Sequence, residues 1–136
     1  MAPLFTWNDS YSVKVALCDS QHKKLFAIIN DLADAMRMGQ GREMISNTTR
    51  ELLDYTRTHF AQEEELLKKT NYPQLALHQE MHRKFVADVE ALDRQTREGR
   101  AANSVQVLNL LRDWLVNHIQ KTDRMYSSHL NAAGIH

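Results

Sequence analysis

The stretch PQLALHQEMHRKFVADVEAL, residues 73–92, decides the fold class of this 136-residue chain. Its apolar side chains recur at intervals of three and four, which is the spacing of one face of an α-helix. That face can be read in two ways at its start, as Leu77 or His78, then Met81 or His82, and then Phe85, Val89 and Leu92. Both readings predict a long amphipathic helix with two histidines on or beside its apolar face.

Similar periodicity on both sides of this stretch predicts three more helices. Helix-breaking residues separate them, namely Gly39 with Gly41, Pro73 and Gly99. We expect helices over about 19–38, 41–69, 73–97 and 103–128, with Asp19 or Ser20 as the first N-cap and Pro73 in the first turn of the third. Because short connections favour antiparallel neighbours, the chain is predicted to be all-α, an antiparallel up-down-up-down four-helix bundle.

We expect one domain over residues 1–136, since no linker, repeat or low-complexity run divides it. Residues 1–18 alternate like a strand, but a single strand has no partner, so we predict an extended N-terminal arm lying across the bundle. The bundle itself is expected over about 19–130, and residues 131–136 are expected to form a frayed tail.

Composition excludes several classes of function. The 17 basic and 17 acidic side chains leave a formal net charge of zero, so no basic surface for nucleic acid is expected. No apolar run approaches the roughly 18 residues that span a bilayer, so no membrane insertion is expected. Residues 1–7 lack the cationic start and apolar run of a secretion signal, and Cys18 is the single cysteine, so we expect a cytoplasmic protein. Zero net charge and the lack of an exposed apolar stripe favour a monomer.

Two pairs of side chains suggest a metal site. His59 with Glu63 and His78 with His82 are each four residues apart, so each pair shares one helix face. Each pair can direct two ligands at one point inside the bundle. Neither pair is specific alone, because Glu63 lies in the polar run 62–65 and histidine pairs also occur on helix surfaces.

His22 on the first helix and His118 with Asp123 on the fourth are further candidate ligands. A single buried histidine is more often an ordinary hydrogen-bonded core residue. His118 and Asp123 are five apart, about 140° around an ideal helix, so they share a face only with a long reach or a π-bulge. Together, however, five histidines and two carboxylates on converging faces would be costly to bury without a shared cation.

These motifs resemble the haemerythrin family, in its single-domain bacterial form. The resemblance covers almost the whole chain and rests on four segments. They are Trp7-Asn-Asp-Ser-Tyr11 with Asp19-Ser-Gln-His22-Lys-Lys-Leu-Phe26, then His59-Phe60 with Glu63, then His78 with His82, and finally Trp114-Leu115-x-x-His118-Ile119-x-x-x-Asp123-x-x-Tyr126. The five-residue spacing of His118 and Asp123 is the spacing of that family.

The resemblance implies a non-haem di-iron protein that binds O2 reversibly as hydroperoxide, for storage, delivery or scavenging. By resemblance, His78, His82 and His118 hold one iron ion, and His22 and His59 hold the other. Glu63 and Asp123 bridge the two Fe2+/Fe3+ ions together with an oxo or hydroxo group. The ion with two histidines then has a vacant position for O2. A separate O2-accepting protein is a conceivable partner.

Further residues are assigned by their place beside these ligands. Phe60, Trp114, Leu115 and Ile119 resemble the apolar pocket of the family, although ordinary core packing explains them as well. Tyr55 and Tyr126 are candidates for hydrogen bonds to the ligands. We expect Cys18 to be a small packing residue, and His129 and His136 to be exposed histidines of the tail.

The principal reading is an O2-binding protein and not an enzyme. Two alternatives stay open on the same centre. One is a di-iron oxidase, peroxidase or nitric-oxide-consuming enzyme, which would turn over with a reductant. The other is an O2 sensor that acts through a separate partner, because 136 residues leave no room for an attached signalling domain.

Overall fold

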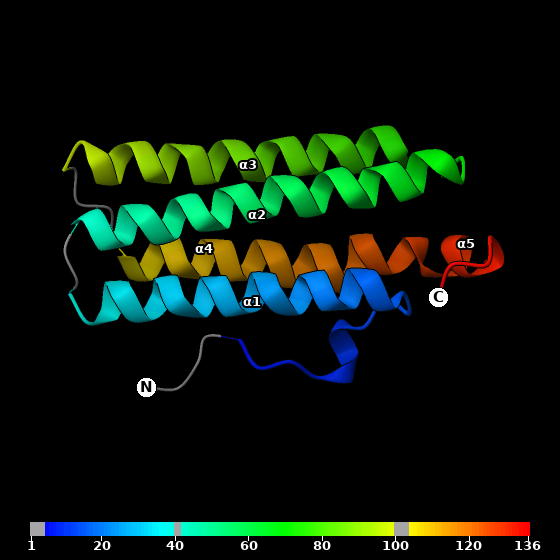
Figure 1. Cartoon of the computed structure of the whole chain (residues 1–136), viewed down its shortest axis with the longest axis horizontal. Helices are drawn as coiled ribbons and strands as arrows, with labels where there is room; N and C mark the ends of the chain where they lie inside the picture. The colour runs from blue at the N-terminus through cyan, green and yellow to red at the C-terminus, as the bar shows by residue number, and fades with distance from the viewer. Residues whose placement is uncertain (1–4, 40–41, 100–103) are drawn as a thin grey trace.

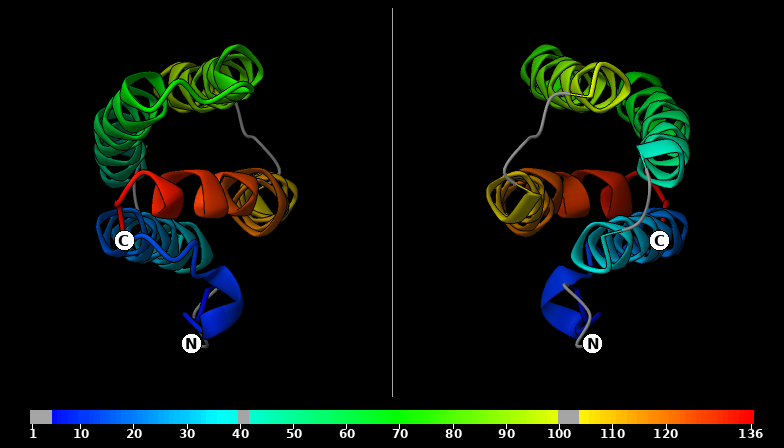
Figure 2. Two further views of the ribbon diagram at one scale, coloured as in Figure 1. Left: turned by 90° about the vertical axis from the view of Figure 1, so that its right-hand side faces the viewer. Right: turned by 90° about the vertical axis from the view of Figure 1, so that its left-hand side faces the viewer.

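The computed structural model describes residues 5–39, 42–99 and 104–136. Its long helices are α1 (Ala16–Arg37), α2 (Arg42–Lys69), α3 (Leu75–Arg97) and α4 (Ser104–Asn117). Each runs antiparallel to the one before it (Figure 1), and the end-on views show α2 between α1 and α3, with α4 beside α1 (Figure 2). The predicted all-α, up-down-up-down four-helix bundle is therefore confirmed.

Two predicted helix starts are wrong. α1 begins at Ala16, and its N-cap Val15 makes no side-chain capping bond. Asp19 lies inside the helix, where it accepts hydrogen bonds from the Ser12 hydroxyl at 2.7 Å and the Val13 backbone N–H at 2.8 Å. The Asp19 carboxylate thus joins the N-terminal arm to α1 by hydrogen bonds and does not cap the start of the helix. α3 begins at Leu75, because Pro73 lies in the preceding turn.

The predicted helix ends are close to those observed. Gly39 and Gly99 follow α1 and α3 with φ of 64° and 73°, a left-handed conformation that glycine adopts without steric cost. Asn71 does the same after α2 with φ of 58°. These residues let the chain reverse direction within a few positions, which produces the antiparallel path.

The core follows the predicted faces, and α3 settles which of its two readings is correct. His78 and His82 are buried, whereas Leu77 is 54% exposed and Met81 is half-buried. The apolar part of the core comes from all four long helices, and its fully or nearly fully buried members include Leu25, Ile29, Leu32, Leu52, Phe85, Val89, Leu92, Leu111 and Leu115.

The N-terminal arm lies along the outside of α1, as predicted (Figure 1). Within it η1 (Asp9–Tyr11) is a short 3-10 turn, and no strand occurs in residues 5–15. Phe5 stacks on Phe26 of α1 with ring centroids 4.2 Å apart, and Asn30 exchanges two hydrogen bonds with the Phe5 backbone. Aromatic stacking and this amide pair hold the arm in place.

The end of the chain is more ordered than expected. Beyond α4 the helical path continues through η2 (His118–Thr122), η3 (Asp123–Tyr126) and α5 (Ser127–Ala132). The Asn131 side chain donates to the Lys14 carbonyl at 3.0 Å, and the Ile135 N–H donates to the Leu130 carbonyl at 2.9 Å. The predicted frayed tail from 131 onwards is therefore wrong, because these bonds fold it back on the bundle.

The prediction for His129 is also wrong. Its ring is half-buried, and Nε2 lies 2.9 Å from the Thr70 carbonyl at the end of α2. His136 is exposed, and Cys18 is buried in the core, both as predicted. None of the helices in the described ranges is long and apolar enough to cross a membrane.

Candidate metal centre

The antiparallel path brings all seven candidate ligands to one end of the bundle, where α1 and α3 start and α2 and α4 finish (Figure 1). His22 is in the second turn of α1, and His78 and His82 are in the first turns of α3. Glu63 follows His59 by one turn in the last third of α2. None of the seven is more than 5% exposed; they are His22, His59, Glu63, His78, His82, His118 and Asp123.

The helix widens where His118 and Asp123 enter the site. η2 is a π-helical segment, and the Asp123 N–H donates to the carbonyls of His118 and Ile119. A hydrogen bond across five residues adds one residue to the turn. His118 and Asp123 consequently share a face, and His118 Nε2 lies 2.9 Å from Asp123 Oδ1. Of the two alternatives that the spacing left open, a long reach or a π-bulge, the structure has the π-bulge.

Each carboxylate faces two groups of histidines with its two oxygens. Glu63 Oε1 lies 2.7 Å from His78 Nε2 and 3.1 Å from His82 Nε2. Its other oxygen, Oε2, lies 3.3 Å from His59 Nε2 and 3.5 Å from His22 Nε2. Both ligand groups therefore share Glu63.

Asp123 makes the same division. Its Oδ1 lies 2.9 Å from His78 Nε2 and 2.9 Å from His118 Nε2, and its Oδ2 lies 3.2 Å from His22 Nε2. We call His78, His82 and His118, with Glu63 Oε1 and Asp123 Oδ1, the three-histidine half. His22 and His59, with Glu63 Oε2 and Asp123 Oδ2, form the two-histidine half. All five histidines present Nε2 to the centre.

Hydrogen bonds on the outer side of the rings orient two of the histidines. The side-chain oxygen Oε1 of Gln21 lies 2.6 Å from His59 Nδ1, and Glu64 Oε2 lies 2.7 Å from His82 Nδ1. Because these oxygens accept the Nδ1 proton, Nε2 is left with a lone pair that faces the centre. Sequence reasoning did not find Gln21 and Glu64, although each is the immediate neighbour of a proposed ligand.

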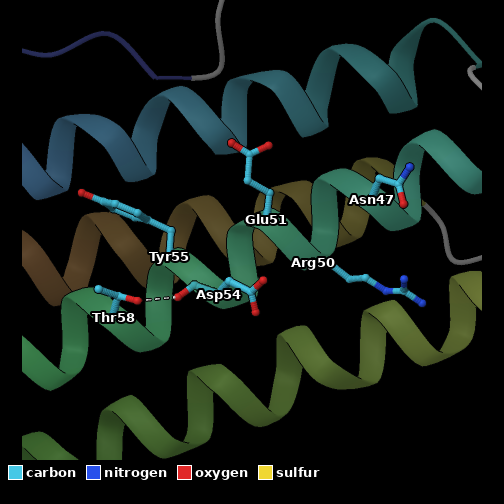
Figure 3. Close-up of a pocket in the computed structure, with 6 residues that line it drawn as sticks. All are labelled: Asn47, Arg50, Glu51, Asp54, Tyr55 and Thr58. Carbon is cyan, nitrogen blue, oxygen red and sulfur yellow. Dashed lines mark hydrogen bonds between the residues drawn. The ribbon is translucent and has the colours of Figure 1, made fainter.

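Of the two tyrosines considered, Tyr126 reaches the site and Tyr55 does not. The Tyr126 hydroxyl donates to Glu63 Oε2 at 2.9 Å, and its ring is fully buried. Tyr55 is half-buried and lines a shallow pocket along α2 with Asp54 and Thr58 (Figure 3). Tyr55 is therefore excluded as a partner of the ligands.

The electrostatics of the centre are those of a buried charge cluster. Burial alone would raise the pKa of Glu63, but His59, His22 and His78 around it hold the pKa well below its usual value. Burial opposes a charge on His22 and His78, yet the neighbouring carboxylates raise the pKa of His22 to about 9 and of His78 to about 10. Without a metal, the carboxylates thus raise the pKa values of His22, His78 and His82 and favour protonated rings beside them.

Apolar and aromatic side chains surround the ligands. Phe60 stacks on the His82 ring with centroids 3.6 Å apart, and Trp114 stacks on the His118 ring at 4.4 Å. Leu115 and Ile119 are each 1% exposed, in the turns that carry His118. The contacts of Phe60 and Trp114 are closest to the three-histidine half, although Phe60 also lies 5.7 Å from the His59 ring.

The donor set fits metal ions. Two ligand atoms at right angles, each roughly 2.1 Å from a metal, lie about 3 Å apart, and the nitrogen–oxygen distances within the two halves range from 2.7 to 3.5 Å. His22 Nε2 and both Asp123 oxygens are buried and make no hydrogen bond. Such atoms call for a partner that the protein itself does not supply. Fold and site together define a four-helix bundle with a histidine-rich metal centre in its core.

Comparisons with known proteins agree with this class. The model of the Hemerythrin HHE cation binding domain matches residues 13–130. A bacteriohemerythrin of Methylococcus capsulatus is 35% identical over 130 residues, covering 95% of this chain and 98% of that protein. A hemerythrin-like protein of Naegleria gruberi is 36% identical over 122 residues, 90% of each chain. The crystal structure of wild-type hemerythrin superposes with a TM-score of 0.87 at 34% identity, covering 93% of this chain and 98% of that one.

This chain belongs to the haemerythrin family. The resemblance predicted from its motifs is thereby confirmed. The family match covers most of the chain, and the single domain over residues 1–136 stays a prediction.

Proposed function

We propose that this chain is a non-haem di-iron protein that binds O2 reversibly. The observation that carries the proposal is the division of seven buried candidate ligands into two unequal halves. Glu63 belongs to both halves, and Asp123 Oδ2 reaches His22 of the second half at 3.2 Å. The three-histidine half offers five ligand atoms and the two-histidine half offers four. Because six-coordination suits iron with nitrogen and oxygen ligands, the two-histidine half has more room for an external ligand.

Held by the five histidines, Glu63 and Asp123, two iron ions with an oxo or hydroxo group would supply the two electrons for reversible binding of O2. Imidazole and carboxylate ligands bind iron, but they also bind zinc and other metals. The identity of the metal is therefore part of the proposal, and so is the assignment of His78, His82 and His118 to one ion and of His22 and His59 to the other.

The chain's own residues hold the ligands and keep water away. The Gln21, Glu64 and Tyr126 side chains fix His59, His82 and Glu63 by hydrogen bonds. Phe60, Trp114, Leu115 and Ile119 surround the ligands with apolar surface. We propose that they form the wall of the O2 pocket, where the absence of water favours release of O2 over loss of electrons to it.

The histidine-rich ligand set supports binding over catalysis. Oxygen-activating di-iron bundles use two Glu-x-x-His motifs and more carboxylates, whereas this site has five histidines and two carboxylates. We therefore propose a binding protein and not an enzyme. A monomer in the cytoplasm, with a separate protein to accept O2, is proposed with it.

The test is to measure iron content and the visible spectrum without O2 after reduction, and then while O2 is added and removed. We expect two iron ions per chain and a charge-transfer band that appears and disappears over repeated cycles. A single irreversible change would contradict reversible binding and favour the oxidase, peroxidase or sensor alternatives. Failure to bind iron would contradict the whole proposal. Size-exclusion chromatography of the iron-loaded protein tests whether it is a monomer in solution.

A further inference from the structure

The two halves of the metal centre differ in the hydrogen-bond partners of their histidines. His82, in the three-histidine half, has the Glu64 carboxylate at Nδ1, whereas His59, in the two-histidine half, has the Gln21 amide. The distances, 2.7 and 2.6 Å, are nearly equal. The difference is therefore one of charge and not of geometry.

The His82 ring is held in one orientation from three sides. Phe60 lies parallel to it, with an interplanar angle of 2°. Nε2 faces the centre, 3.1 Å from Glu63 Oε1, and Nδ1 faces Glu64. Because an ionised carboxylate can only accept hydrogen bonds, the proton of the pair must lie on His82 Nδ1. Glu64 is itself 24% exposed, and the Gln79 and Arg83 side chains lie near enough to interact with its carboxylate.

The Gln21 amide is oriented just as firmly. Its Nε2 donates to the Gln62 side-chain oxygen, so its own carbonyl oxygen must face His59. Gln21 is 9% exposed, and the rest of the His59 ring contacts His22 and Phe60. In the two-histidine half, the neutral Gln21 amide thus gives His59 the same ring orientation that the Glu64 carboxylate gives His82.

We propose that Glu64 and Gln21 are positioning residues that make the two metal positions electronically unequal, with the ferric state favoured in the three-histidine half. A hydrogen bond to a carboxylate is stronger than one to an amide and makes the imidazole a better electron donor. More electron density at Nε2 stabilises the higher charge of ferric iron. The position with room for O2 is consequently the one that stays ferrous longer.

This inference rests on the proposed di-iron function. Oxidation of the three-histidine position removes one electron, which the mediator dye of a potentiometric titration accepts. The Nδ1 proton stays in the hydrogen bond between His82 and Glu64, so this pair neither gains nor loses a proton. The difference between the halves therefore appears in the two one-electron midpoint potentials.

The experiment is a potentiometric titration of the iron-loaded protein and three variants. In Glu64→Gln the carboxylate is replaced by an amide of the same shape, and we expect ferric iron to be disfavoured about tenfold, which raises the first midpoint potential by about 59 mV. In Gln21→Glu the change is reversed on the other half, and we expect the second midpoint potential to fall by a similar amount. Glu65→Gln is the matched control, because Glu65 is the next residue of α2 and is exposed.

Iron content of each variant is measured first. If Glu64→Gln shifts the potential no more than Glu65→Gln, the inference is wrong. It is also wrong if Gln21→Glu leaves both potentials unchanged. If Glu64→Gln fails to retain iron, Gln21→Glu decides alone. Failure of the proposed function shows separately, since it appears in the wild-type protein as missing iron or as an irreversible reaction with O2.

Discussion

The two ends of the bundle each bury a carboxylate, and they treat it differently. At the end remote from the metal centre, Asp93 accepts a hydrogen bond from the Ser46 hydroxyl at 3.0 Å and pairs with Arg97 at 3.1 Å. Leu32, Leu52 and Val89 fill the core beside it. At the other end, Asp123 is fully buried, contacts only histidine nitrogens among the described ion pairs, and makes no hydrogen bond.

Asp93 and Asp123 show how a carboxylate in a metal site differs from one that only stabilises the fold, although both are buried in the same bundle. Asp93 is satisfied by a hydroxyl and a guanidinium that the chain provides, so this carboxylate needs no ligand. The chain gives the Asp123 oxygens no hydrogen bond, so Asp123 and the histidines around it form a cluster suited to a cation. We therefore expect substitutions at the remote end to change stability without changing metal binding. At the metal end, folding and metal binding are expected to depend on each other.

The largest difference between the two ends of the bundle is expected when Glu63, the carboxylate that both halves of the metal centre share, is removed. In Glu63→Ala we expect iron content to fall from two ions per chain to none, because Glu63 Oε1 and Oε2 serve different halves. The matched control is Asp93→Asn, which should lose about 1–3 kcal/mol of stability and retain its iron. Metal analysis of the folded variants decides, and a Glu63→Ala variant that retains both ions would contradict the ligand assignment.

A cavity at the remote end should affect stability alone. Leu52 is fully buried, so Leu52→Ala is expected to lower the free energy of unfolding by about 2–5 kcal/mol. Denaturant unfolding measures this loss. Iron per folded chain should stay at the wild-type value, and a lower value would show that the two ends are not separable.

A cavity at the metal end should instead affect the lifetime of the O2-bound protein. Leu115 is 1% exposed and lies one turn before His118. In Leu115→Ala we expect water to enter and autoxidation to become several-fold faster, with iron content unchanged. Decay of the visible band under air gives the rate, with Leu52→Ala as the control. Equal rates in Leu115→Ala and wild type would remove Leu115 from the pocket wall.

The smallest expected effect is a pH dependence confined to the metal-free protein. The pKa values of His22 and His78 are raised from 6.5 to about 9 and about 10. The stability that these imidazolium groups contribute is complete below pH 6.5 and is lost as the pH rises through 9 to 10. We expect the metal-free protein to unfold more easily at pH 9.5 than at pH 6.5.

Thermal unfolding at the two pH values measures this difference. The iron-loaded protein is the control, because metal-bound histidines carry no extra proton to lose. The same decrease in the loaded and the metal-free protein would show that other groups cause it.

The candidate ligands could be placed on inward faces from the sequence because helix periodicity is local. The i, i+4 pairs His59 with Glu63 and His78 with His82 share a face in any helix, whatever surrounds it. Sequence reasoning failed where contacts between distant segments decide. The start of α1 depends on Asp19 bonding to the arm, and the burial of His129 depends on the end of α2. Neither contact leaves a periodic pattern in the sequence.

The outer partners of the histidines show the same limit. Gln21 and Glu64 stand beside ligands in the sequence, but several polar neighbours do so as well, and only the bundle shows which of them reaches a ring nitrogen. The spacing of His118 and Asp123 is a middle case. The sequence indicated that an ideal helix would not bring His118 and Asp123 to one face, and the structure shows that the π-helical segment η2 does so.

The sequence by itself determined the four helices, their antiparallel order and the seven ligand types, because spacing and helix-breaking residues act within a few positions of the chain. The resemblance assigned the five histidines to two ions, but only the tertiary structure decided how the oxygens of the two carboxylates divide between these two groups of histidines. That division depends on which oxygen of Glu63 and of Asp123 faces which histidine, and these atoms meet across four helices.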